Sequence, residues 1–262
     1  MVYGDSGGPV SVVRQALILA GGNGTRLAPL GEYLPKCLAT VYNRPLIDYS
    51  LRLLETASLT DVYIAVSERH HSVVSACIRL LERKIRIHLL DEKLPAGIRA
   101  LFEAGRQMPH EPFLFVLGDI YFGSEHMAPA TLPHGIEVVL FSHLFNNPAR
   151  LSAETANLVC EGQTVVAIRD KPRPENVEGC LGWNAMALIR PEFLTREQAI
   201  FEWLAGCRPN PAIGDLFSAA VALGAKIQAL PGPEGAWLNV NSPDQLFKAG
   251  CIEQQKHRSV AD

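Results

Sequence analysis

A glycine-rich segment near the beginning of the sequence has the residue types that bind phosphate groups. Gly21, Gly22 and Gly24 follow a short apolar run, and without side chains they let successive backbone N–H groups surround phosphate oxygens. Arg26 and Lys36 come next. An arginine binds a phosphate through two parallel N–H bonds, and a lysine adds a compact positive charge. The combination predicts phosphoryl or nucleotidyl transfer, in which a triphosphate is bound and pyrophosphate leaves.

Two better-known glycine loops do not fit this spacing. A Walker A loop needs Gly-x-x-x-x-Gly-Lys-Ser/Thr, whereas Thr25 follows Gly24. A dinucleotide-binding fingerprint needs a glycine or alanine where Leu27 stands, because a bulky side chain there separates the helix from the strand. An ordinary strand-to-helix turn explains one glycine, but not three of them with a Thr-Arg pair and a later Pro-Lys pair.

An aspartate stands at the end of another apolar run. A strand is predicted over residues 113–117, and Gly118 and Asp119 follow its last residue, Leu117. Ligands of α/β proteins bind outside the carboxyl ends of the strands, where a lone carboxylate is most useful to a cation. Asp119 is therefore a candidate Mg²⁺ ligand, and the alternative is an aspartate that caps a turn or a helix.

The elements that must position these residues alternate in the first half of the chain. Short apolar runs predict strands, and apolar residues at helical spacing predict helices. Strands are predicted over 16–20, 61–66, 85–90 and 113–117, and helices over 45–57, 73–84 and 98–108. This order predicts an α/β fold with a mainly parallel sheet and helices on both faces.

The second half has more strand-like runs with short turns between them, which predicts that the sheet becomes mixed. Strands are predicted over 137–142, 156–160, 164–168, 184–189 and 226–230, and helices over 197–204, 215–223 and 243–255. No Pro/Ser-rich linker separates the halves. We therefore expect a flexible leader over 1–14 and a single domain over 15–262, with halves at 15–135 and 136–262.

The segment Gly4-Asp5-Ser6-Gly7-Gly8-Pro9 matches the sequence around the nucleophile of trypsin-like serine proteases. In that family the histidine and aspartate of the triad precede the serine by long stretches of a double β-barrel, whereas only five residues precede Ser6 here. The protease interpretation is rejected, and the segment is taken as part of the leader.

Composition and charge exclude several classes of protein. The 262 residues carry 24 Lys and Arg against 27 Asp and Glu, and 48% are hydrophobic, which suits a globular protein without a basic surplus for nucleic acid. No apolar run approaches the roughly 20 residues of a membrane span, and no secretory signal is visible. The six cysteines and eight histidines have neither disulfide nor zinc-site spacing. We expect a cytoplasmic protein with no membrane or nucleic-acid partner.

The phosphate-binding segment resembles the signature of a known family. Residues 21–27, GGNGTRL, followed by Pro35-Lys36-Cys37-Leu38 are similar to the GGxGTRL and PKxL motifs of sugar-1-phosphate nucleotidyltransferases. The resemblance extends with weakening motifs from Ala16 to about Lys248. It implies a Rossmann-like fold, Mg²⁺ dependence, nucleotide binding by the first half and sugar-phosphate binding by the second, and possible homo-oligomers. Within this length we expect no C-terminal left-handed β-helix domain.

The resemblance also implies roles for single residues. It makes Arg26 and Lys36 catalytic, and it places the segment 95–101 at the base. The implied nucleotide-binding residues are Leu19, Ala20, Gly21, Gly22, Gly24, Thr25, Gly97 and Gly118. By the same resemblance, Asp119 binds the catalytic Mg²⁺.

The acceptor side departs from the family pattern. Asp170-Lys171-Pro172 resembles the Glu-Lys-Pro motif, whose lysine contacts the sugar phosphate, so Lys171 is implied to be catalytic and Asp170 to bind the sugar. The shorter carboxylate side chain at position 170 suggests an acceptor that differs from the commonest hexose phosphates. Asn184 is implied to line the sugar pocket, where Met186 replaces a glycine frequent in relatives.

A second departure concerns the metal. Residues 237–246, WLNVNSPDQL, resemble the closing Trp-x-Asp-x-x-Thr-Pro segment, whose aspartate is often the second Mg²⁺ ligand, and Asn239 occupies that position. An amide oxygen coordinates a hard cation without adding negative charge, so we expect weaker Mg²⁺ binding. Asn241 is the reserve candidate, and a turn asparagine is the alternative for both.

The resulting prediction is Mg²⁺-dependent transfer of a nucleoside monophosphate to a sugar 1-phosphate, giving a nucleoside diphosphate sugar and pyrophosphate. The motif spacing most resembles thymidylyl and uridylyl members, which favours dTTP or UTP and leaves guanosine and cytidine open. One alternative is a cytidylyl- or guanylyltransferase with a phosphocholine, phosphonate or heptose phosphate acceptor. The other is a nucleotide-sugar-binding regulator that has lost catalysis.

Overall fold

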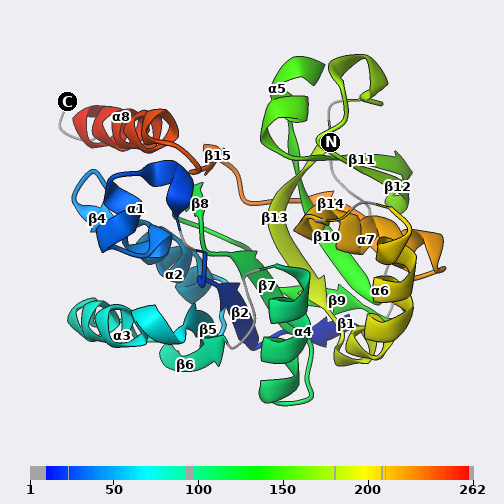
Figure 1. Ribbon diagram of the computed structural model, residues 1–262, viewed down its shortest axis with the longest axis horizontal. Helices are drawn as coiled ribbons and strands as arrows, with labels where there is room; N and C mark the ends of the chain where they lie inside the picture. Colours follow the sequence, from blue (N-terminus) through cyan, green and yellow to red (C-terminus); the bar gives the residue numbers. More distant parts are fainter. Residues whose placement is uncertain are drawn as a thin grey trace.

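A nine-stranded sheet with helices on both faces organises the molecule in the computed structural model (Figure 1). The structure describes residues 10–22, 24–92, 97–179, 181–207, 209 and 211–259. The order of the strands in the sheet is β10-β14-β12-β11-β13-β7-β2-β5-β6. Both halves of the sequence therefore contribute strands to one sheet.

The first half forms the parallel side of the sheet. Its strands are β2 (Gln15–Leu19), β5 (Asp61–Ser67), β6 (Arg86–Glu92) and β7 (Phe113–Leu117). Its main helices are α2 (Leu46–Thr56), α3 (His71–Leu80) and α4 (Ile98–Gln107). Parallel pairs join β2 to β5 and β7, and β5 to β6. Each of these elements was predicted from periodicity, with boundaries that differ by a few residues.

The second half forms the mixed side. Its strands are β10 (Val138–Leu144), β11 (Ala156–Glu161), β12 (Thr164–Asp170), β13 (Leu181–Ile189) and β14 (Ile227–Pro231). Its helices are α5 (Pro148–Glu154), α6 (Glu197–Ala205), α7 (Ile213–Ala222) and α8 (Pro243–Ser259). Only β10 and β14 pair in parallel here, and β13 joins β7 antiparallel. The expected mainly parallel sheet thus holds for the first half, while the fold as a whole is mixed α/β.

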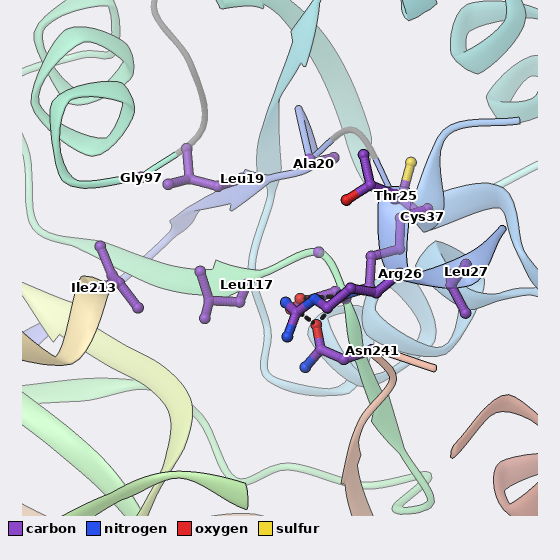
Figure 2. Close-up of a pocket in the computed structure, with 15 residues that line it drawn as sticks. Leu19, Ala20, Thr25, Arg26, Leu27, Cys37, Gly97, Leu117, Ile213 and Asn241 are labelled. Carbon is purple, nitrogen blue, oxygen red and sulfur yellow. Dashed lines mark hydrogen bonds and ion pairs between the residues drawn. The ribbon is translucent and has the colours of Figure 1, made fainter. Parts of the chain in front are cut away.

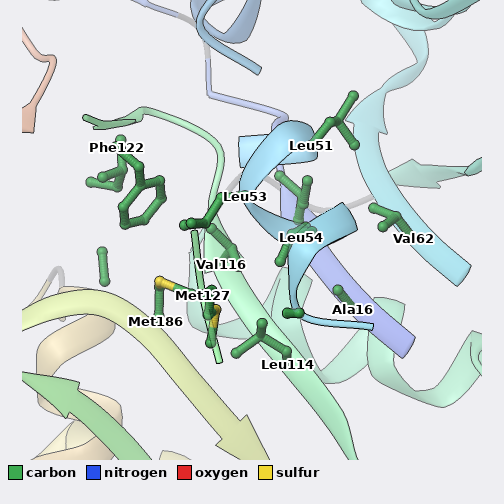
Figure 3. Close-up of a cluster of buried hydrophobic side chains, with 14 of the residues drawn as sticks. Ala16, Leu51, Leu53, Leu54, Val62, Leu114, Val116, Phe122, Met127 and Met186 are labelled. Atoms are coloured by element: carbon green, nitrogen blue, oxygen red, sulfur yellow. The ribbon is translucent and has the colours of Figure 1, made fainter. Parts of the chain in front are cut away.

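Alternating side chains of the strands build two apolar layers. Ala16 and Ile18 of β2 point toward α2, and Leu17 and Leu19 point toward α4, because successive side chains of a strand face opposite sides. Figure 3 shows the first layer, where Leu51 and Leu54 of α2 pack near strands of the sheet. The second layer lies under α4, α6 and α7. Packing on both faces fixes the strand ends that carry the site.

Small elements complete the fold. Short strands form three two-stranded sheets: β1 (Val10–Val12) with β9 (Thr131–Pro133), β3 (Thr40–Val41) with β4 (Arg44–Pro45), and β8 (Ile120–Phe122) with β15 (Trp237–Asn239). Helix α1 covers Leu30–Tyr33. These elements were not predicted, because two to four residues carry too little periodicity.

The expectation of a flexible leader over 1–14 needs correction at its end. Residues 10–12 form β1, which is held by antiparallel pairing with β9, and the Arg14 carbonyl accepts hydrogen bonds from the backbone of Thr60 and Asp61. The motif at residues 4–9 lies outside the described residues. In the described part of the chain, no helix is long and apolar enough to span a membrane.

Candidate active site

A cavity of about 330 Å³ opens at the carboxyl ends of β2 and β7 (Figure 2). Its walls come from the glycine segment, the start of α4, the residues after β7, the start of α7 and the segment after β15. The lining residues are Leu19, Ala20, Gly22, Gly24, Thr25, Arg26, Leu27, Lys36, Cys37, Gly97, Leu117, Gly118, Asp119, Ile213 and Asn241. Most of the residues predicted to bind the nucleotide thus meet at one place.

The parallel pairing of β2 and β7 brings the first two motifs together. Leu19 and Leu117 are register partners at the strand ends, so the glycine segment and Gly118-Asp119 leave the sheet side by side. The Gly118 N–H donates to the Leu19 carbonyl at 2.8 Å, and a Cβ at Gly118 would lie 2.7 Å from that oxygen. A side chain at position 118 would therefore push the two strand ends apart.

Arg26 lies in a short 3-10 helix that follows the glycine segment. Gly24 begins this helix with φ 62°, a left-handed conformation that favours glycine. Leu27 is buried and anchors the turn, while Arg26 is exposed at the cavity. The Arg26 guanidinium donates to the Asn241 Oδ1 at 2.8 Å. Figure 2 shows these two side chains meeting on one side of the cavity, opposite Leu19, Gly97, Leu117 and Ile213.

Lys36 is the centre of the polar network. Its Nζ donates to the Asp119 Oδ2 at 2.5 Å and to the Asn241 Oδ1 at 2.6 Å. Burial lowers the pKa of Lys36, the ion pair with Asp119 opposes this effect, and the positive charges of Arg26 and Lys171 lower the pKa further. The lysine is thus a buried cation near two others, an arrangement that favours a polyanionic ligand.

Asp119 has an unused oxygen. Its Oδ2 binds Lys36, while its Oδ1 is buried and has no hydrogen-bond partner among the described residues. A buried carboxylate oxygen without a partner is costly, and a hard cation would satisfy it. No group of three or more His, Cys, Asp or Glu side chains suited to a metal occurs in the described residues. The donors therefore fit Mg²⁺ held by one carboxylate together with substrate phosphates.

The two asparagines of the closing segment occupy different places. Asn241 lines the cavity and binds both cations. Asn239, predicted as the second metal ligand, is not among the lining residues, and its Oδ1 accepts a hydrogen bond from the Asn241 Nδ2. The reserve candidate thus stands closer to Lys36 and Arg26 than the first choice.

The predicted acceptor residues are placed outside the lining of this cavity. Lys171 is exposed with φ 43°, near enough for its charge to lower the pKa of Lys36. Asp170 ends β12 beside Gly214 of α7. Asn184 is buried, and its Oδ1 accepts from the backbone N–H of Met186 at 3.2 Å. Their roles in binding a sugar phosphate stay predictions.

A buried acid beside the glycine segment was not predicted from the sequence. Glu92 ends β6, and a Cβ on Gly21 would overlap its Oε2 at 1.6 Å. Neither carboxylate oxygen has a hydrogen-bond partner among the described residues. Burial, reinforced by the negative charge of Glu103, raises the pKa of Glu92 to about 7. The available signal was an acidic residue shortly after the strand predicted over 85–90.

Comparison with known proteins connects this site to a family. Residues 15–132 match the model of the family described as Nucleotidyl transferase. A glucose-1-phosphate thymidylyltransferase of Neisseria meningitidis is 27% identical over 254 residues, which cover 92% of this chain and 82% of that protein. A mannose-1-phosphate guanyltransferase of Emericella nidulans is 32% identical over 245 residues, 91% of this chain. The match spans 64% of the guanyltransferase, so the chain covers less than two thirds of its length.

The fold has solved counterparts as well. The structure of a UDP-glucose pyrophosphorylase complexed with UDP-glucose superimposes with a TM-score of 0.71 at 17% identity, covering 93% of this chain and 99% of that one. The mixed α/β architecture is therefore that of solved nucleotidyltransferase structures. Over residues 15–132 the chain is therefore similar to the nucleotidyl transferase family, and over most of its length it is similar to sugar-1-phosphate nucleotidyltransferases.

Proposed function

We propose that the protein transfers a nucleoside monophosphate from a nucleoside triphosphate to a sugar 1-phosphate in a Mg²⁺-dependent reaction. The observation that carries this proposal is the convergence of Arg26, Lys36 and Asp119 on one cavity. Two cations and an aspartate with a free oxygen match the needs of a bound triphosphate and its metal ion.

The reaction is an in-line displacement. An oxygen of the acceptor phosphate attacks the α-phosphorus of the triphosphate, the bond to the β-phosphate oxygen breaks, and pyrophosphate leaves. The attacking phosphate is largely ionised near neutral pH, because its second pKa is about 6, so no general base is required. Catalysis then rests on positioning the two phosphates and neutralising charge.

Each residue of the cation cluster has a distinct part in this scheme. Arg26 binds phosphate oxygens through its guanidinium, and the buried Lys36 neutralises negative charge as pyrophosphate departs. Asp119, with the amide oxygen of Asn239, would hold Mg²⁺. Mg²⁺ bound there would supply Lewis-acid polarisation of the phosphate oxygens. Lys171 orients the acceptor phosphate from outside the cavity.

The base and the acceptor are the finer parts of the proposal. Motif spacing favours dTTP or UTP, and the apolar wall of Leu19, Leu117 and Ile213 supplies a surface on which a base can lie. A sugar 1-phosphate is the acceptor supported by the homologues. The short Asp170 side chain keeps a phosphocholine, phosphonate or heptose phosphate acceptor as the alternative.

The test is pyrophosphate release with Mg²⁺, in which four nucleoside triphosphates are crossed with glucose, mannose, N-acetylglucosamine and heptose 1-phosphates and phosphocholine. We expect one triphosphate and one sugar phosphate to give turnover, and Arg26→Ala to abolish it. Turnover with phosphocholine and with none of the sugar 1-phosphates would show that phosphocholine, not a sugar 1-phosphate, is the acceptor. Nucleotide binding without release for any pair would favour a non-catalytic regulator.

A further inference from the structure

The amide oxygen of Asn241 is the point where the two predicted phosphate-binding cations meet. It accepts a hydrogen bond from the Lys36 Nζ at 2.6 Å and from the Arg26 guanidinium at 2.8 Å. Asn241 is 215 residues from Arg26 and 205 from Lys36 in the sequence. The neutral side chain of Asn241 thus connects Arg26 and Lys36, the two cations that follow the glycine segment.

The orientation of this amide is fixed by its other contacts. The Asn241 Nδ2 donates to the Asn239 Oδ1, and the Asn241 backbone N–H donates to the Gln245 Oε1 at 2.6 Å. Gln245 belongs to the first turn of α8. Because the NH₂ group is used by Asn239, the oxygen must face the cations. The start of α8 and the end of β15 together aim Asn241 into the cavity.

The two cations need such an acceptor. Arg26 lowers the pKa of Lys36 by repulsion, so the two side chains disfavour each other's approach. Arg26 is exposed and has no acidic partner within hydrogen-bonding distance among the described residues, whereas Lys36 is also held by Asp119. Without Asn241, Arg26 would lose the contact that holds it over the cavity and would gain side-chain freedom.

We propose that Asn241 is a positioning residue. In the free protein its amide oxygen holds Arg26 and Lys36 close together, so that both cations already point to the place where a phosphate oxygen binds. This inference rests on the proposed function for the identity of the ligand. A ligand phosphate then meets a cation pair that is already assembled, so less ordering is required on binding. The side chain acts through the two cations and needs no contact with the reacting atoms.

The experiment measures binding of inorganic tripolyphosphate to the full chain by calorimetry, without Mg²⁺. Asn241→Ala is expected to weaken binding about tenfold, the effect of losing hydrogen bonds to charged groups. Asn241→Asp is expected to weaken it more, because a carboxylate would pair with both cations and compete with the anion. Gln254→Ala, which removes an exposed neutral amide side chain of α8 outside the cavity, is the matched control and should bind within about twofold of the wild type.

A second measurement separates positioning from general damage. In an Arg26→Ala background, Asn241→Ala should lower the affinity for tripolyphosphate by a clearly smaller factor than in the wild type, because its effect acts partly through the missing arginine. Equal costs in both backgrounds would overturn the inference, as would wild-type affinity in Asn241→Ala or in Asn241→Asp. Thermal unfolding of each variant establishes that it is folded.

The outcome is independent of turnover. Tripolyphosphate binding requires neither a base nor an acceptor, so the expected pattern in a protein that gives no pyrophosphate release would sustain the role of Asn241 and refute the proposed reaction. Turnover by the wild type, together with unaltered tripolyphosphate binding in Asn241→Ala, would sustain the proposed reaction and refute the role of Asn241.

Discussion

The triphosphate end of the site and the predicted acceptor end differ in how far they are assembled. Arg26, Lys36 and Asn241 are joined by direct hydrogen bonds within one cavity, although they come from distant parts of the chain. Among the residues that the structure describes, Lys171 is exposed and makes no hydrogen bond to this network, and Asn184 is buried in the protein. If the proposed roles hold, the free protein is organised for the nucleotide before the acceptor.

This difference follows from the architecture. The triphosphate end lies over parallel strands whose carboxyl ends are in register, where packed layers on both faces hold the loops. The acceptor residues belong to antiparallel strands or follow them: Asp170 ends β12, Lys171 comes directly after it, and Asn184 lies within β13. Such an arrangement predicts that nucleotide binding precedes acceptor binding.

The largest expected effect comes from breaking the assembled end at Asp119. Asp119→Ala removes the ion pair with the buried Lys36 and the free oxygen offered to Mg²⁺. We expect kcat/KM to fall on the order of 10³-fold, measured by pyrophosphate release. Asp244→Ala, an exposed acid at the start of α8, is the control and should retain activity. A loss below about tenfold would contradict the role of Asp119.

A smaller and more selective effect is expected at the acceptor end. Lys171→Ala should raise the KM for the sugar phosphate by about 10- to 100-fold, the worth of a charge-assisted contact, while the Kd for the nucleotide stays nearly unchanged. Steady-state kinetics and calorimetry measure the two quantities. Lys248→Ala, an exposed lysine on α8, should change neither. If Lys171→Ala weakened nucleotide binding as strongly as acceptor binding, the two ends would not be separate.

The metal requirement sharpens the comparison further. Asn239→Asp keeps the acceptor for the Asn241 amide and adds a negative charge near Asp119. The Mg²⁺ concentration for half-maximal rate should drop several-fold, since the charge count of the ligands tunes affinity for hard cations. An unchanged Mg²⁺ requirement would place Asn239 outside the metal site. Asn239→Ala, which lacks the amide oxygen, should raise the requirement.

The smallest effect concerns stability at Glu92. Its pKa is raised to about 7 from the ordinary 4.5, so the folded protein binds more protons than the unfolded chain between these values. The stability of the wild type relative to Glu92→Gln should therefore fall as pH rises from about 4.5 to 7 and level off above. Thermal unfolding at pH 5 and pH 8 measures this. We expect a gain on the order of 1 kcal/mol for Glu92→Gln at pH 8, and an equal difference at both pH values would refute it.

The periodicity of apolar residues predicted the long helices and strands. The motifs pointed to the residues that are proposed to bind the triphosphate. Helices such as α2 and α4 have apolar residues at helical spacing, β7 is a fully apolar run, and β2 is apolar after Gln15. The glycine segment is one continuous stretch of sequence, and so is Gly118-Asp119. The local pattern of each stretch was therefore enough to identify it. Their meeting in space follows from the parallel pairing of the two strands.

The rest depended on contacts between distant residues. The network from Arg26 through Asn241 to Lys36 joins segments more than 200 residues apart, and no local pattern encodes it. Nor does local sequence show that Asn184 is buried within β13 or that Glu92 lies against Gly21. Antiparallel strands of the second half were identified, but their order in the sheet depends on long-range pairing.

The central claim is that a nucleotidyl group is transferred intact to a sugar phosphate. Phosphorus NMR of the protein with Mg²⁺, a nucleoside triphosphate and a sugar 1-phosphate follows both products at once. The account predicts equal growth of pyrophosphate and of a pair of coupled diphosphate resonances from the nucleoside diphosphate sugar. Formation of nucleoside diphosphate and inorganic phosphate with the sugar phosphate unchanged would contradict it.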